Sequence, residues 1–265
     1  MGQNSPFFSL VIPLLARNSS LLFFTLQSLA SQKYTSFEVL LIDGREEKDC
    51  PKPWEGMELP NWEIVSLPGA SLPALQNEGL SLAQGAYIHF LLPGEFYLSN
   101  NSLVFAHQFL LKSQKPDLMY AGCMIRHSFA APEVLLKEID REALQKGDLC
   151  PTMQPYFFLK DSLLALGGLS EQYEIQAGLE KIYQYFSLPE MKKVYMPRIL
   201  TDYEYRLPTP AHLLLQMKET CSILFSYFGL RFPLFLWVRK VFFRFVLWEG
   251  KKIQRAVYKQ RKPFS

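Results

Sequence analysis

Four charged side chains stand just beyond short apolar runs of the sequence, where they could contact a ligand. They are Arg17, Asp43, Arg45 and Glu95. A guanidinium pairs with phosphate oxygens through two parallel hydrogen bonds, and a carboxylate accepts hydrogen bonds or gives an oxygen ligand to a hard cation. Arg126 is a third arginine that could contact phosphate, but Arg17 and Arg45 are favoured because each follows a predicted strand. The alternative for each arginine is an ordinary exposed side chain.

The apolar runs are typical of strands buried on both faces, and helical segments alternate with them. The predicted strands are 8–13, 37–42, 62–67, 86–92 and 118–125. This alternation predicts an α/β fold with a mainly parallel sheet flanked by helices. Ligands of such sheets bind beyond the carboxyl ends of the strands, so the charged side chains are expected to share one crevice.

Five residues carry local predictions. Asn18 or Ser19 is expected to cap the first helix and Ser71 the second, because their side chains can accept hydrogen bonds from unpaired helix N–H groups. Gly85 is expected to close the second helix. His89 lies in mid-strand and is expected to be a hydrogen-bonded core residue.

The charge is divided unevenly along the chain. Residues 231–262 hold ten Lys/Arg and one acid, a net charge of +9, whereas the rest holds 18 Lys/Arg and 24 Asp/Glu, a net charge of −6. Apolar residues, among them Trp237 and Trp248, recur there at helical spacing. A basic, aromatic helix is typical of segments that bind an anionic membrane surface, which we expect of residues 232–262. A helix packed on the protein's own core is the alternative, and nucleic acid is disfavoured because no recognised binding module accompanies the charge.

Composition argues against several other classes. With 49% hydrophobic and 20% charged residues, the chain is too apolar to be disordered. Its four cysteines lack metal-site spacing and are expected to be idle thiols in a reducing compartment. No basic segment precedes residues 7–15, which are predicted as a strand and not as a signal peptide. No window of about 20 residues is free of charge, so no ordinary membrane-spanning helix is predicted.

Five segments resemble blocks of the family-2 glycosyltransferases, which have the GT-A fold. In chain order they are Phe8-Ser9-Leu10-Val11-Ile12-Pro13, Phe37-Glu38-Val39-Leu40-Leu41-Ile42-Asp43, the block from Asn77-Glu78-Gly79-Leu80 to Tyr87-Ile88-His89-Phe90-Leu91, Gly167-Gly168-Leu169-Ser170-Glu171, and Tyr203-Glu204-Tyr205-Arg206. Their order and spacing over residues 8–206 imply a Rossmann-like GT-A domain.

The resemblance implies a nucleotide site and a metal site from which several family residues are missing. Asp43 matches the first acid of a pair that helps to hold the nucleotide base, and Gly44 replaces the second. The family's Asp-x-Asp turn, which holds Mn²⁺ or Mg²⁺ on the diphosphate, is replaced by Leu92-Pro93-Gly94-Glu95. Glu95 is the one residue of that turn that could contact a metal, so a divalent cation is expected only if this single acid suffices.

Two further roles are carried over from the family. Glu180 matches the position of the general base, which would take a proton from an acceptor hydroxyl, and a solvent-exposed helix residue is the alternative. Pro13 matches the start of a nucleotide-binding segment, but the residues after it, up to Arg17, lack the family's polar contacts.

The chain is therefore expected to comprise a glycosyltransferase domain, residues 1–207, and a helical, membrane-associated tail, residues 208–265. One hypothesis is an enzyme that transfers a sugar from a nucleotide-sugar donor to a lipid-linked or surface-glycan acceptor. It would be cytoplasmic and peripheral on the inner face of the membrane. The other hypothesis is a catalytically degenerate fold that binds a nucleotide, glycan or partner without turnover, because most of the family's acids are missing.

Overall fold

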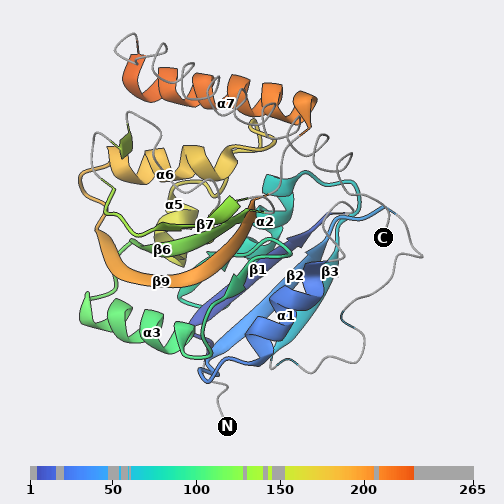
Figure 1. Cartoon of the computed structure of the whole chain (residues 1–265), viewed down its shortest axis with the longest axis vertical. Helices are drawn as coiled ribbons and strands as arrows, with labels where there is room; N and C mark the ends of the chain where they lie inside the picture. The colour runs from blue at the N-terminus through green and yellow to red at the C-terminus, as the bar shows by residue number, and fades with distance from the viewer. Residues whose placement is uncertain are drawn as a thin grey trace, which may run out of the picture. The chain divides into compact units, whose positions relative to one another are not determined.

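A computed structural model shows the arrangement of the chain (Figure 1). The structure describes residues 5–15, 21–46, 54, 59, 61–127, 130–139, 143–144, 153–205 and 209–229. Within these ranges the side chains of residues 127, 130, 204 and 205 are not described. Predictions for Arg17 and for the tail at 232–262 concern residues outside these ranges.

The first half of the sheet is parallel, as the apolar runs predict. It consists of β1 (Phe8–Leu14), β2 (Phe37–Asp43), β3 (Trp62–Ser66) and β4 (Tyr87–Phe90), in the spatial order β3-β2-β1-β4. All seven residues of β1 are buried. A strand with neighbours on both edges and helices on both faces has no exposed side, which explains its continuous apolar sequence.

The second half of the sheet mixes strand directions. β8 (Tyr156–Leu159) lies antiparallel between β4 and β6 (Leu118–His127), and β9 (Lys193–Tyr205) runs parallel to β6. Two short antiparallel strands that the sequence did not predict complete it. They are β5 (Phe96–Tyr97), which pairs with β9, and β7 (Ala130–Leu135), which pairs with β6.

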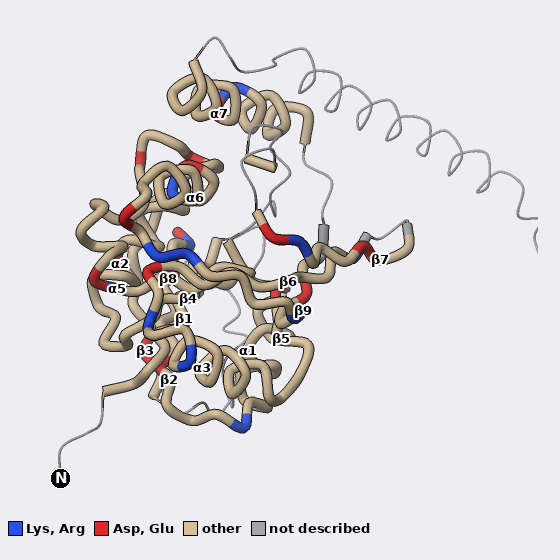
Figure 2. Tube along the Cα trace, turned by 90° about the vertical axis from the view of Figure 1, so that its left-hand side faces the viewer, with Lys and Arg blue, Asp and Glu red and all other residues tan. Residues whose placement is uncertain are grey.

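Helices cover both faces of this sheet. They are α1 (Leu22–Ala30), α2 (Leu72–Leu82), α3 (Ser102–Lys112), α5 (Lys160–Ala165) and α6 (Ala177–Ser187), followed by α7 (Pro210–Phe228). Alternate β1 residues such as Leu10 pack with apolar residues of α1 and α3. Val11 points to the other face, where it contacts Gly79 of α2 so closely that a Cβ there would lie 2.3 Å from it. Figures 1 and 2 show α3 and α6 on opposite sides of the sheet.

The local predictions have mixed outcomes. Ser71 caps α2 as predicted, because its hydroxyl accepts a hydrogen bond from the Ala74 N–H at 3.4 Å. The predicted cap of α1 is wrong, since Leu21 is the N-cap residue and makes no side-chain hydrogen bond. Gly85 is not the C-cap of α2, which is Ala83. A glycine is needed at Gly85 because a Cβ would lie 2.6 Å from the main-chain nitrogen of Ser9.

The chain divides into two compact units, residues 1–139 with 150–220 and residues 140–149 with 221–265. The predicted boundary at residue 207 stays a prediction. No described helix is long and apolar enough to cross a membrane. Cys123 is buried and Cys221 is half-buried.

Candidate functional site

The carboxyl ends of β1, β2 and β4 bring Asp43 and the turn at 92–95 to one edge of the sheet. β1 lies between β2 and β4, with Leu14 opposite Asp43 and Val11 opposite Phe90. β4 ends at Phe90, the Leu91 N–H still donates to the Val11 carbonyl at 3.0 Å, and the turn at 92–95 follows directly. Because neighbouring strands are about 4.8 Å apart, Asp43 and this turn are separated by about 10 Å.

Asp43 is bound by Arg45 through two parallel hydrogen bonds. The Arg45 Nε donates to Asp43 Oδ1 at 2.9 Å, and Nη2 donates to Oδ2 at 2.9 Å. The Arg45 main-chain N–H also donates to Oδ1, at 3.1 Å. The Arg45 guanidinium lies 5.2 Å from the ring centre of Trp54, an attractive cation–π distance. Two of the four predicted nucleotide-binding residues, Asp43 and Arg45, therefore form one fixed pair.

Packing explains why glycine replaces the second acid at position 44. A Cβ on Gly44 would lie 2.7 Å from Cδ1 of Leu75, and the main-chain N–H of Gly44 donates to Leu14 at 3.0 Å. A longer acidic side chain here would require Leu75 of α2 to move. The end of β2 at Gly44 thus packs closely against the Leu75 side chain of α2.

The turn after β4 is built around the Glu95 carboxylate. Glu95 Oε2 accepts a hydrogen bond from the Leu92 N–H at 2.7 Å, and Glu95 is only 3% exposed. Gly94 has φ +97°, and a Cβ there would lie 2.5 Å from Leu21. The turn therefore has neither the backbone conformation nor the space for an acid at position 94.

These residues do not fit the metal site that the family resemblance implies. No group of three or more His, Cys, Asp or Glu side chains that could hold a metal ion occurs among the described residues. A divalent cation of this kind binds oxygen ligands, and Glu95 uses one of its oxygens to hold its own turn. We therefore assign no catalytic step to a metal.

A buried ion pair that sequence reasoning missed lies beside this turn. Asp202 of β9 is opposite Phe96 of β5, the residue after Glu95. Asp202 is 1% exposed and accepts a hydrogen bond from Arg126 Nε. The Arg126 side chain is 36% exposed, with its guanidinium 5.0 Å from the ring centre of Phe96. Arg126 thus presents a held but accessible positive charge near the turn.

Helix α6 begins near the same edge and carries Glu180 in its first turn. A Cβ on Gly178 would lie 2.4 Å from Met153, which precedes β8. The amino end of β8 lies beside the carboxyl end of β4, where Phe157 is opposite His89. Glu180 is partly exposed as a residue, while its carboxylate oxygen Oε2 is buried.

The remaining predicted residues are placed as follows. Pro13 is buried within β1 and lies opposite Ile42, one residue before the strand ends. Arg17 lies outside the described residues. His89 is a buried core residue as predicted, with Nδ1 hydrogen-bonded to the Tyr97 hydroxyl and Nε2 to the Gln154 carbonyl oxygen. Since a carbonyl only accepts, Nε2 carries the proton and Tyr97 donates to Nδ1.

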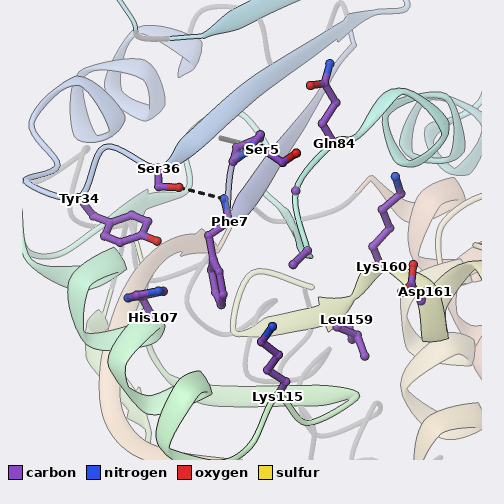
Figure 3. Close-up of a pocket in the computed structure, with 13 residues that line it drawn as sticks. Ser5, Phe7, Tyr34, Ser36, Gln84, His107, Lys115, Leu159, Lys160 and Asp161 are labelled. Carbon is purple, nitrogen blue, oxygen red and sulfur yellow. Dashed lines mark hydrogen bonds between the residues drawn. The ribbon is translucent and has the colours of Figure 1, made fainter. Parts of the chain in front are cut away.

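A separate cavity of about 760 Å³ lies at the opposite edge, by the amino ends of β1 and β4 (Figure 3). Its aromatic wall includes Tyr34 and His107, whose ring centres are 4.8 Å apart. Lys160 lines it but donates its ammonium hydrogen bond to the Ala83 carbonyl. None of the predicted site residues lines this cavity.

The sheet order, with the charged residues at its carboxyl edge, defines a GT-A-type glycosyltransferase fold. The structure of S. aureus TarS 1–349 in complex with UDP matches with a TM-score of 0.63 at 14% identity, over 83% of this chain and 65% of that one. TarS 1–349 in complex with UDP-GlcNAc gives 0.60 at 16% identity, over 83% and 67%. The mannosyltransferase PcManGT from Pyrobaculum calidifontis, in complex with GDP-Man and Mn²⁺, gives 0.58 at 13% identity, over 84% and 64%.

This chain thus spans about two thirds of the length of these structures, and 44% of a longer TarS structure. By sequence, no protein-family model and no curated protein matches it. The structural similarity to these glycosyltransferases therefore establishes the fold of this chain and nothing further.

Proposed function

We propose that this protein transfers a sugar from a nucleotide-sugar donor to a glycan or lipid-linked acceptor. The observation that supports the proposal is that Asp43 ends β2 at the carboxyl edge of the sheet, while Gly178, two residues before Glu180, packs against Met153, which precedes β8 beside the end of β4. Ligands of open α/β sheets bind at that edge. The solved structures of similar fold bind UDP, UDP-GlcNAc or GDP-Man, which supports this class of donor.

In this proposal, Asp43 binds the nucleotide base. Its carboxylate is fixed by Arg45, and a carboxylate in a fixed orientation can accept an N–H from the edge of a base. A base must either share the Asp43 oxygens with Arg45 or displace the guanidinium. Trp54, on the far side of Arg45, limits how far the arginine can move.

Arg126 neutralises the diphosphate in place of the missing acidic turn and its metal. Its guanidinium is held by Asp202 and Phe96 and remains partly exposed beside the turn at 92–95. A positioned arginine stabilises negative charge as it develops on a leaving diphosphate. Arg17 stays a second phosphate-binding prediction from the sequence.

The transfer step needs one base. An acceptor hydroxyl oxygen bonds to the anomeric carbon, the bond from that carbon to the phosphate oxygen breaks, and the nucleoside diphosphate leaves with the electron pair. Glu180 takes the hydroxyl proton. Glu180 lies in the first turn of α6 and is partly exposed, with the carboxylate oxygen Oε2 buried.

A second candidate function is nucleotide or glycan binding without turnover. The inward-facing Glu95 and the lack of space for an acid at Gly94 favour it, because the family's metal-binding turn is absent. Both functions use Asp43, so nucleotide binding does not separate them. Turnover does.

Hydrolysis of a nucleotide sugar separates the two functions without a known acceptor, because water can replace the acceptor hydroxyl. We expect slow release of UDP or GDP from UDP-GlcNAc or GDP-Man, lost in Glu180→Gln. Glu190→Gln, at an exposed acid beyond the end of α6, is the matched control. Binding with no release, in wild type and both variants, would leave the non-enzymatic function.

We propose, from sequence alone, that residues 232–262 bring this domain to an anionic membrane, on its cytoplasmic face, where a lipid-linked acceptor would be found. Deleting residues 232–265 should release the protein from anionic liposomes in a sedimentation assay. If the truncated protein still sediments with the liposomes as the full chain does, the tail is not the membrane anchor.

A further inference from the structure

A carboxylate from α7 holds the start of α6. Glu219 accepts hydrogen bonds from three consecutive main-chain N–H groups, those of Glu174 at 2.7 Å, Ile175 at 3.0 Å and Gln176 at 2.9 Å. Glu219 is 6% exposed, and it belongs to the same compact unit as these residues. Three donors converging on one carboxylate form a specific, charge-assisted contact.

This contact reaches Glu180 through one residue. The N–H of Gln176 donates to Glu219 Oε2, and the carbonyl of Gln176 accepts the first helical hydrogen bond from the Glu180 N–H at 2.9 Å. Gln176 is the N-cap of α6, but its own side chain makes no capping hydrogen bond. Glu219 therefore binds the N–H of the N-cap residue and those of the two residues before it, and so fixes the turn that leads into α6.

The sequence around α6 explains why a remote residue takes this role. No Ser, Thr, Asp or Asn stands at the N-cap, and the turn before the helix ends on Gln176. A negative charge at this position is also favourable to the helix dipole. Without Glu219, residues 174–176, which lead into α6, would depend on water for these three hydrogen bonds.

We propose that Glu219 is a positioning residue for the general base: it fixes the turn that leads into α6, and through Gln176 the start of the helix, so that Glu180 points to the acceptor hydroxyl. This inference rests on the proposed function. It also makes α7 part of the catalytic apparatus, because the helix before the basic tail holds the turn that carries the base.

The test compares Glu219→Ala, Glu219→Gln and a matched control, Glu174→Gln, an exposed acid in the same turn. We expect kcat for nucleotide-sugar hydrolysis to fall roughly 10- to 100-fold in Glu219→Ala, since misplacing a catalytic group by about 1 Å can cost that much. KM for the donor should stay within about twofold, because the donor contacts lie elsewhere. Glu174→Gln should match wild type in both constants.

Acetate rescue distinguishes positioning from general destabilisation. Glu219→Ala leaves a small cavity with three N–H donors, so added acetate should restore much of kcat in a saturable way. Glu219→Gln fills the cavity and should not respond. Hydrogen exchange should show faster exchange at the amides of residues 174–176 and 180 in Glu219→Ala, slowed again by acetate.

Two outcomes would overturn this inference and leave the proposed function standing. In the first, the wild type is active and kcat is unchanged in Glu219→Ala. In the second, Glu219→Ala is folded by thermal unfolding, but its loss of kcat is not reversed by acetate. A wild type that binds nucleotide sugars but never turns them over would remove the proposed enzymatic function, and the positioning role with it. Faster exchange in Glu219→Ala would then show only that Glu219 stabilises the start of α6.

Discussion

The side-chain amide of Asn77 makes two reciprocal hydrogen bonds with the main chain of Leu169. Asn77 Nδ2 donates to the Leu169 carbonyl at 2.9 Å, and the Leu169 N–H donates to Asn77 Oδ1 at 2.8 Å. The contact joins α2 to the glycine turn that follows α5, across 92 residues of sequence. Two of the segments that resemble glycosyltransferases therefore meet in space through these residues.

Removing the Asn77 amide should destabilise the domain. We expect Asn77→Ala to lower the free energy of unfolding by about 2 kcal/mol, because the two hydrogen bonds to Leu169 and a third, from Asn77 Nδ2 to Glu171 Oε1 at 3.2 Å, are lost and the main-chain groups of Leu169 lose their partner. Urea unfolding measures this. Asn101→Ala is the control, because Asn101 makes no capping side-chain hydrogen bond in α3, and a loss of equal size there would contradict the account.

Much of the fold could be predicted because burial on two faces leaves a strong signal. The apolar runs of β1 and β2 predict buried strands from local sequence alone, and Ser71 in the same way predicts the start of α2. The short strands β5 and β7 could not be predicted, since two to six residues at the edge of a sheet have no distinctive periodicity. The N-cap of α1 was missed because Leu21 does not use a side-chain hydrogen bond there.

The candidate site was predictable in part. Asp43 and Glu180 could be found from the resemblance, and the strand ends predicted a shared edge. That Arg45 pairs with Asp43, and that Asp202 holds Arg126, depends on neighbours distant in sequence or on side-chain direction. The close packing of Gly44 against the Leu75 side chain likewise joins residues far apart in the sequence.

Arg126 should matter for nucleotide binding more than for stability. We expect Arg126→Ala to weaken nucleotide-sugar affinity about tenfold or more, because a charge-assisted contact to phosphate contributes about 1.5–3 kcal/mol. The same change leaves Asp202 with less compensation for its buried charge, so some stability is lost as well.

A double variant separates these two effects. Arg126→Ala with Asp202→Asn removes both charges and should recover stability in a thermal melt. Nucleotide affinity, measured by calorimetry, should stay low. Recovery of affinity together with stability would mean that Arg126 acts only through the fold.

His89 should make the protein less stable in mild acid. Burial lowers the pKa of His89 from its ordinary 6.5 to about 4, so between these values the unfolded chain binds a proton that the folded chain does not. Stability from this residue is complete above about pH 6.5 and is lost as the pH falls to about 4. The loss should be about 3 kcal/mol, since one pKa unit corresponds to about 1.4 kcal/mol.

The variant His89→Gln isolates this contribution. It should be less stable than wild type at pH 7, because the contacts to Tyr97 and Gln154 change, but its stability should fall less between pH 7 and pH 4. Urea unfolding at several pH values gives both quantities. Parallel pH curves for the two proteins would show that His89 does not titrate as described.

Glu95 should act as a structural residue of its turn. We expect Glu95→Gln to lower stability by about 1–3 kcal/mol, because the Leu92 N–H loses a charged acceptor. Any effect of Mn²⁺ on nucleotide affinity should be the same in variant and wild type. An enhancement by Mn²⁺ that disappears in Glu95→Gln would show instead that this carboxylate binds the metal.

The most direct test of the account is calorimetric titration of the full chain with UDP-GlcNAc and GDP-Man, with and without Mn²⁺. We expect saturable binding of at least one of them. Affinity should fall about tenfold or more in Asp43→Asn, which loses a charged acceptor for the base, and should be unchanged in Asp161→Asn, an exposed acid at the opposite edge of the sheet (Figure 3). No binding of either nucleotide sugar, or equal binding in Asp43→Asn, would contradict the assignment of this edge as the nucleotide-sugar site.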